Sequence, residues 1–313
     1  MQNTSLDVII VGAGPAGVSC SMWLQQLGFS TVLIDKNPAC GGLQLSNPYT
    51  NTWIASSADA KGEDISRALH ENALRHGAAL RLSCQAQQAW FAEDAWHVRL
   101  EDGEVLSAKR LVLAGGVVPK SGGFLSRAAL LIGPGPQVVN TRFEGSKVAI
   151  LGGGDSAFEN HVVVSERGAR EVHIYARTLK ARAEMLARVA PENVFLGEFK
   201  VDSVHKLVNG QVYDHILVLF GYEANKAALL GLEPALRING FVQTDGECRT
   251  SIPGVYAIGE LAQRAHPCCV TSMADGVVAA KAIQRELEEG LAARYLNGVR
   301  RGLALFKKVG GGA

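Results

Sequence analysis

Two glycine-rich turns carry the residues with the clearest chemistry in this chain. The first reads Gly12-Ala13-Gly14-Pro15-Ala16-Gly17 and the second reads Gly152-Gly153-Gly154-Asp155-Ser156-Ala157. Each turn follows a short apolar run, at 8–11 in one case and 148–151 in the other. A strand that leads through such a turn into a helix presents backbone N–H groups to a pyrophosphate. Two of these fingerprints predict two dinucleotide sites, and two dinucleotides that meet usually exchange hydride.

The residues that would contact the adenosine ribose differ between the two halves. After the first turn, the next apolar run ends at Asp35, whose carboxylate can accept hydrogen bonds from ribose hydroxyls. After the second turn, the corresponding position is Tyr175, and Arg177 and Arg182 follow it. Guanidinium groups can bind a 2′-phosphate through paired hydrogen bonds, whereas a carboxylate would repel it. The first turn therefore fits FAD and the second fits NADPH; the alternative for the two arginines is a solvated basic loop.

Composition narrows the class of protein. Hydrophobic residues make up 47% of the 313 positions, charged residues make up 19%, and the formal net charge is +1. This balance is typical of a globular, core-rich protein and gives no reason to expect a nucleic-acid partner. No apolar run reaches the ~18 residues of a membrane span, and the first strand begins too early for a signal peptide. We therefore expect a soluble cytoplasmic protein. The six cysteines form no CxxC and no metal-binding spacing with histidine, so we expect no metal site.

The order of the predicted elements gives the domain organisation. Segments 6–35 and 147–175 both have the βαβ pattern, and a connector rich in glycine, proline and serine separates them. A strand running into Gly259 and Glu260, followed by a helix from about 271 to 287, completes the first half. The predicted fold is α/β, with two Rossmann-like dinucleotide-binding domains and the second inserted into the first. Its predicted parts are an FAD domain at 1–116 and 246–293, an NADPH domain at 117–245, and a basic C-terminal tail at 294–313.

Short motifs spread along nearly the whole chain resemble those of a known family. Beyond the two turns and Asp35, they are Gly41-Gly42 followed by Trp53, Ala114-Gly115-Gly116 ahead of Pro119, the segment 254–260 and the helix at 271–280. Together they resemble the thioredoxin-reductase-like branch of the two-dinucleotide-binding flavoproteins. For FAD, the turn and this resemblance predict contacts from Gly12, Gly14, Pro15, Ala16, Gly17, Asp35, Lys36, Gly42, Gln44, Ala114, Gly115, Gly259, Glu260, Cys269 and Val270. For NADPH, they predict contacts from Gly152, Gly154, Asp155, Ser156, Ala157, Arg177, Arg182 and Gly221.

Three departures from the family pattern bear on function. Glu260 stands where family members usually carry aspartate, and the usual Gly-Gly-Gln-Leu reads Gly41-Gly42-Leu43-Gln44-Leu45 here, which leaves open which residue reaches the flavin. Thioredoxin reductases also place a redox CxxC just before the second glycine turn. This chain has no cysteine between Cys84 and Cys248, so it has no such dithiol to relay electrons.

The resemblance then implies an FAD-dependent NADPH oxidoreductase that passes electrons to an external acceptor. Ferredoxin/flavodoxin–NADP reductases of thioredoxin-reductase type share the Gly-Gly-Gly-Asp-Ser-Ala turn, and Phe220-Gly221-Tyr222 is a further similar detail. Those reductases usually lay a C-terminal ring on the flavin, for which Tyr295 and Phe306 are the candidates. The basic tail could attract an acidic ferredoxin or could be a solvated helix face. The resemblance also implies a homodimer.

Two other functions remain open. The resemblance puts His266, Cys268 and Cys269 where the chain passes the flavin ring, and a thiol near a helix N-terminus has a lowered pKa. These residues could act on a small disulfide or another organic acceptor, or the cysteines could be inert packing and His266 a helix cap. The chain could also be a flavin-based redox sensor that is not an enzyme.

Overall fold

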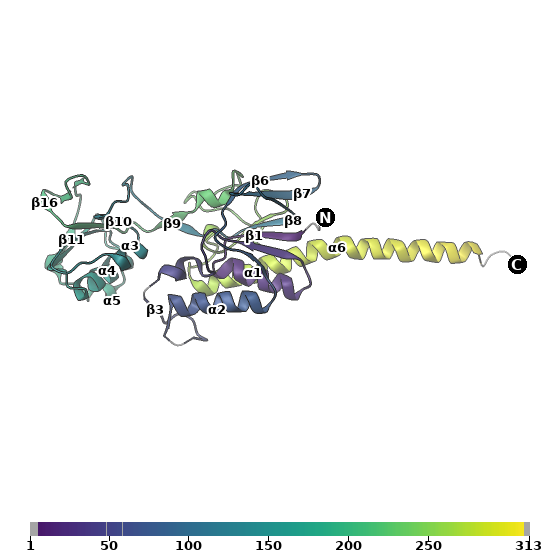
Figure 1. Ribbon diagram of the computed structural model, residues 1–313, viewed down its shortest axis with the longest axis horizontal. Coiled ribbons are helices and arrows are strands. Elements are labelled where there is room, and N and C mark those ends of the chain that lie inside the picture. The colour runs from purple at the N-terminus through teal and green to yellow at the C-terminus, as the bar shows by residue number, and fades with distance from the viewer. Residues whose placement is uncertain (1–5, 48, 58, 310–313) are drawn as a thin grey trace.

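The computed structural model describes residues 6–47, 49–57 and 59–309, with side chains described as far as residue 289. Figure 1 shows two lobes side by side: the first, on the right, contains β1 and α1, and the second, on the left, contains β11 and α4. The long C-terminal helix α6 extends from the first lobe. Each lobe is built on its own sheet with helices packed against it. Within the described part of the chain, no helix is both long enough and apolar enough to cross a membrane.

The first lobe contains a seven-stranded sheet in the order β5-β2-β1-β8-β7-β6, with β19 also paired to β8. Strands β5, β2, β1, β8 and β19 run parallel, and the β6–β7–β8 part is antiparallel. The nine-residue β8 pairs with β7 through its first half and with β19 through its second half. The bounds are β1 (Leu6–Val11), β2 (Thr31–Ile34), β5 (Ala79–Arg81), β6 (Ala86–Ala92), β7 (Ala95–Leu100), β8 (Val105–Leu113) and β19 (Val255–Ala257).

Helices and hydrophobic clusters cover both faces of this sheet. Strands β1, β2 and β8 are almost wholly apolar where they are central, as parallel strands buried on both faces are. One face packs against α1 (Pro15–Gln26), α2 (Gly62–Arg75) and α6 (Cys269–Val309). A Cβ on Gly276 of α6 would lie 2.5 Å from the Ala16 carbonyl oxygen, so this glycine lets α1 and α6 pack closely.

The second lobe contains a five-stranded parallel sheet in the order β10-β17-β11-β12-β13. Its strands are β10 (Leu130–Ile132), β11 (Lys147–Leu151), β12 (Glu171–Ala176), β13 (Val194–Leu196) and β17 (His215–Val218). Its helices are α3 (Pro136–Asn140), α4 (Asp155–Glu166) and α5 (Ala183–Leu186), with the short 3-10 helix η2 (Pro191–Asn193) after them. A small antiparallel sheet follows: β14 (Val201–Asp202), β15 (Leu207–Val208) and β16 (Gln211–Val212).

An antiparallel pair of strands joins the lobes. Strand β9 (Val117–Pro119) leaves the first lobe and β18 (Tyr222–Ala224) returns to it, with Val117 opposite Ala224. The shorter elements of the first lobe are η1 (Gly42–Ser46), β3 (Thr50–Asn51), β4 (Ala60–Lys61), η3 (Lys226–Leu229) and η4 (Gly259–Leu261).

The chain after β18 does not follow the predicted division. Residues 225–245 were predicted to belong to the NADPH domain, but Leu230, Phe241 and Val242 lie in a core cluster of the first sheet. The Ala89 N–H donates to the Leu230 carbonyl at 2.9 Å. Because β18 pairs with β9, the chain is already back at the first lobe when it leaves Ala224.

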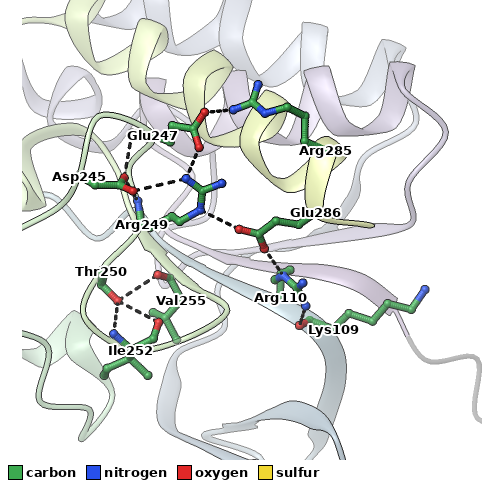
Figure 2. A network of polar contacts seen from close by, with 10 residues as sticks. All are labelled: Lys109, Arg110, Asp245, Glu247, Arg249, Thr250, Ile252, Val255, Arg285 and Glu286. Carbon is green, nitrogen blue, oxygen red and sulfur yellow. Dashed lines mark hydrogen bonds and ion pairs between the residues drawn. The ribbon is translucent and has the colours of Figure 1, made fainter. Parts of the chain in front are cut away.

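Helix α6 also extends beyond its expected end near residue 287. It continues to Val309, since no proline follows position 267 to interrupt it. Its attachment to the first lobe includes a network of charged side chains (Figure 2). Glu286 accepts hydrogen bonds from Arg110 Nε at 2.8 Å and from Arg249 Nε at 2.7 Å, while Arg285 and Arg249 both contact Glu247. The tail residues predicted to carry function, among them Tyr295 and Phe306, have side chains outside the described residues.

Candidate functional site

The first glycine turn is shaped by close backbone contacts. Gly12 has φ +113°, and a Cβ there would lie 2.3 Å from the Ala114 carbonyl oxygen at the end of β8. A Cβ on Gly17 would lie 1.9 Å from the Gly12 carbonyl oxygen, so a glycine is needed for α1 to begin against the turn. Gly14 precedes α1, and no described side chain caps the first turn of that helix. The N-terminus of α1 is therefore open to a phosphate.

A cavity of about 480 Å³ lies in front of this turn. Chain segments far apart in sequence line it: the turn itself, the end of β2, η1, residues 114–118, the start of η4 and the start of α6. Of the residues predicted for FAD, it gathers Gly12, Gly14, Pro15, Ala16, Asp35, Lys36, Gly42, Gln44, Ala114, Gly115, Gly259, Glu260, Cys269 and Val270. Gly17 lies behind the turn rather than on the cavity wall. The lack of room for a Cβ at Gly12 and Gly17, the uncapped start of α1 and the cavity in front of it fit a bound FAD.

Asp35 is held in a fixed orientation at the edge of the cavity. Its Oδ2 accepts a hydrogen bond from the Ala13 N–H at 2.6 Å. Its Oδ1 accepts from the Asn37 N–H at 2.8 Å and from the Asn37 side-chain amide at 2.9 Å. The carboxylate thus ties the end of β2 to the glycine turn, and its remaining lone pairs are available to ribose hydroxyls.

The two neighbouring cysteines at the start of α6 have different environments. Cys268 lines the cavity and is partly exposed; burial opposes ionisation, but hydrogen bonds from Thr271 outweigh it and lower the pKa of this thiol. The Thr271 N–H lies 3.4 Å from Cys268 Sγ. Cys269 is buried, and burial raises its pKa to about 11. Burial also raises the pKa of Glu260, which lines the same cavity.

His266 does not join this group. Its side chain is exposed and lies outside the residues that line the cavity. Its backbone carbonyl accepts a hydrogen bond from Thr271 Oγ1 at 2.7 Å, so its described contact concerns the start of α6 rather than the cavity.

The second glycine turn, between β11 and α4, is built in the same way. A Cβ on Gly152 would lie 2.3 Å from the Leu219 carbonyl oxygen, and one on Gly153 would lie 2.0 Å from the Thr178 carbonyl oxygen. Gly154, in contrast, faces open space, and no described side chain caps the first turn of α4. The helix end that could receive a pyrophosphate is again unobstructed.

The other residues predicted for NADPH lie around this turn in different settings. The Ser156 carbonyl accepts a hydrogen bond from Asn160 Nδ2 at 2.8 Å, and Ala157 is fully buried. Gly221, at φ +84°, lies just before β18 and also faces open space. Arg177 is largely exposed, with its Nε 3.5 Å from Glu198 Oε2.

Arg182 is bound to Asp155, the first residue of α4. Its backbone N–H donates to Asp155 Oδ1 at 2.7 Å, and its Nε donates to Oδ2 at 2.6 Å. Burial works against ionisation of Asp155, but these hydrogen bonds outweigh it and lower the pKa of the carboxyl group. The negative charge that the sequence places at this turn is thus compensated by a neighbouring arginine.

A loop of the first lobe reaches the second lobe next to this turn. Tyr49 donates its hydroxyl to Asn160 Oδ1 of α4 at 3.0 Å. The ring of Trp53 lies under the Arg182 guanidinium, with 5.7 Å between Cζ and the ring centroid. In the sequence, Trp53 is only one of the motif residues that carry the family resemblance, and no local pattern marks Tyr49 or Asn160. A contact between lobes leaves no such pattern.

The element just before β11 is α3, where the resemblance predicts the position of the thioredoxin-reductase CxxC. Its residues are Pro136-Gln137-Val138-Val139-Asn140, with no cysteine among them. A second cavity, of about 320 Å³, lies beside it, lined by Tyr49, Val138, Asn160 and Arg167 among others. The polar side chains there are engaged: Arg167 donates to the carbonyls of Val138, Val139 and Thr141.

Comparison with known proteins gives a consistent family. The model of the pyridine nucleotide-disulphide oxidoreductase family matches residues 6–281. A thioredoxin reductase of Mycoplasmopsis pulmonis is 25% identical, with 92% of this chain and 99% of the relative covered. A ferredoxin–NADP reductase of Lactococcus lactis subsp. cremoris is 27% identical, with 90% and 95% covered.

Solved structures show the same fold. A thioredoxin reductase of Lactococcus lactis, in its FR conformation, superposes with a TM-score of 0.76 at 21% identity, covering 91% of this chain and all of that one. A bacillithiol disulfide reductase of Bacillus cereus superposes with a TM-score of 0.75 at 17% identity, covering 90% and 100%.

Proposed function

Because the chain belongs to the pyridine nucleotide-disulphide oxidoreductase family, we propose that it passes electrons from NADPH through FAD to an external acceptor. Membership makes it an FAD-dependent NAD(P)H oxidoreductase. The observation that carries the choice of acceptor is the composition of α3, which offers no dithiol ahead of the second glycine turn. We propose ferredoxin or flavodoxin as the acceptor. Relatives named ferredoxin–NADP reductase, from Lactococcus lactis and Ignicoccus hospitalis, align over 90% and 82% of the chain.

The chain's own residues would bind and orient rather than react. The uncapped starts of α1 and α4 would hold the two pyrophosphates, Asp35 the FAD ribose, and Arg177 with Arg182 the 2′-phosphate. Bound FAD supplies a carrier that takes up hydride from NADPH and can release electrons singly. Alignment and exclusion of water, rather than a side-chain acid, would promote the transfer. A homodimer and a cytoplasmic location stay predictions.

Anaerobic stopped-flow mixing of the FAD-loaded protein with NADPH tests this proposal. We expect the flavin absorbance to bleach and then to recover when oxidised ferredoxin or flavodoxin is added. Reduced flavin that neither carrier reoxidises, but that a small disulfide does, would contradict the proposed acceptor. Flavin that NADPH does not bleach would favour the redox sensor instead.

Cys268 supports a second candidate function, the reduction of a small disulfide. It lines the FAD cavity and its pKa is lowered, whereas Cys269 is buried with a raised pKa. The variant Cys268→Ser separates the two candidates, with Cys84→Ser as a control at another partly exposed cysteine that lines the same cavity. Disulfide turnover lost in Cys268→Ser alone, with ferredoxin reduction intact, would support the thiol; turnover retained in both variants would exclude it.

A further inference from the structure

Trp53 lies between the two nucleotide sites although it belongs to the first lobe. It follows β3 in a loop that its own N–H helps to fix by donating to Asn51 Oδ1 at 3.0 Å. Its side chain lines the FAD cavity, yet 73% of the residue is exposed. An indole this exposed contributes little to a hydrophobic core. Its described ring contact is with Arg182 of the second lobe, at 5.7 Å, within the range of a cation–π interaction.

Arg182 is held on two sides and open on the third. Asp155 accepts from its backbone N–H and from Nε, and Cζ of the guanidinium lies over the indole ring. No described residue accepts a hydrogen bond from Nη1 or Nη2. These two terminal nitrogens form the fork that binds a phosphate through parallel hydrogen bonds. The contacts present therefore hold the guanidinium at Nε and over the indole ring, and they leave its two terminal nitrogens free among the described residues.

The charges nearby make this orientation matter. The carboxylates of Asp155, Glu184 and Glu159 all raise the pKa of the Arg182 guanidinium, so its positive charge is already partly balanced. Arg177 is itself paired with Glu198. Because carboxylates lie beside both arginines, net positive charge alone would not hold a phosphate here. Its binding would depend on N–H donors that are already oriented toward the phosphate oxygens.

We infer that Trp53 is a positioning residue for the 2′-phosphate of NADPH: its ring orients the Arg182 fork, so that selection of NADPH over NADH depends on a side chain from the FAD-binding lobe. This inference rests on the proposed function, because it takes NADPH as the reductant bound at the second turn. Asp155 fixes the inner edge of the same guanidinium from its own lobe.

Equilibrium binding to the FAD-loaded full chain tests the inference, by titration calorimetry with NADP⁺, NAD⁺ and 2′-AMP as probes. In Trp53→Leu, we expect the Kd for NADP⁺ and for 2′-AMP to rise about two- to fivefold, with the Kd for NAD⁺ unchanged. Trp53→Phe keeps an aromatic face and should restore most of the affinity for both phosphorylated probes. Trp23→Leu, which removes another exposed tryptophan on α1, is the matched control and should change none of the three values.

Indole fluorescence gives a readout that does not depend on the stability of the leucine variant. Addition of 2′-AMP should change the emission of the wild type and of Trp23→Leu, but not that of Trp53→Phe. A wild type that binds NADP⁺ no tighter than NAD⁺ would contradict the proposed reductant itself. A selective wild type whose selectivity survives Trp53→Leu would overturn the role of Trp53. Equal weakening of NADP⁺ and NAD⁺ would also overturn it, because the loop would then only hold the lobes together.

Discussion

Arg177 differs from Arg182 in being held by one distant ion pair, with its side chain 71% exposed. If it binds the 2′-phosphate, reversing its charge should affect one nucleotide far more than the other. We expect Arg177→Glu to raise the KM for NADPH about tenfold, because a charge-assisted hydrogen bond becomes a repulsion, and to leave the KM for NADH nearly unchanged.

Steady-state oxidation of both nucleotides by the same preparation measures this effect. Arg170→Glu is a suitable control, since Arg170 is also exposed and lies 3.7 Å from Glu171 in the same lobe. An equal rise in both KM values would show that Arg177 is not a phosphate ligand.

The two cysteines at the start of α6 should react at different pH. The thiolate is the reactive form, and the pKa of Cys268 lies below that of an ordinary cysteine while that of Cys269 is raised to about 11. As the pH rises, Cys268 should therefore ionise and alkylate first, and Cys269 should stay protonated at pH 8. Mass spectrometry after treatment with iodoacetamide at several pH values would show this order; simultaneous labelling would contradict it.

At the scale of elements, the charged network of Figure 2 connects α6 to β8 and to the segment before β19. Glu286 is about one-quarter exposed and accepts from two arginines, so its removal leaves both partly buried charges short of a partner. We expect Glu286→Gln to lower the free energy of unfolding by about 1–2 kcal/mol, measured by urea denaturation.

The exposed pair Arg142–Glu144 provides the comparison for that measurement. Its side chains are 87% and 69% exposed, so Glu144→Gln should change stability by less than about 0.5 kcal/mol. If both substitutions had the same small effect, the network would contribute no more than an ordinary surface pair.

Elements with a strong local pattern could be predicted from the sequence. The two strand–turn–helix units stand where the glycines and apolar runs put them, and the Gly12 and Gly17 contacts give the physical reason. Helix α6 was predicted to end near residue 287, but it continues through Gly290, Gly298 and Gly302 to Val309, because glycine weakens a helix without ending it as proline does. Contacts between lobes, such as Tyr49 with Asn160 or Trp53 with Arg182, could not be predicted, because they depend on how two separately formed sheets are placed.

For the molecule as a whole, the important feature is that the second lobe enters and leaves through one pair of strands. Pro119 lies opposite Tyr222 in that pair. The residues on either side of the second lobe are therefore neighbours, and a short bridge could join them. The core clusters of the second lobe are drawn from residues of that lobe alone, and those of the first lobe include the returning segment up to Leu287.

It follows that the second lobe, for which we propose binding of the nicotinamide nucleotide, should be separable as a cassette. A chain in which a short glycine–serine bridge replaces 120–221 should still fold, turn yellow with FAD and fail to be bleached by NADPH. Absorbance of the purified protein at the flavin bands measures whether this shortened chain binds FAD. A colourless product would mean that the first lobe needs the second lobe in order to fold. Exchange of the second lobe between related proteins should then change which nucleotide donates electrons and leave FAD binding unchanged.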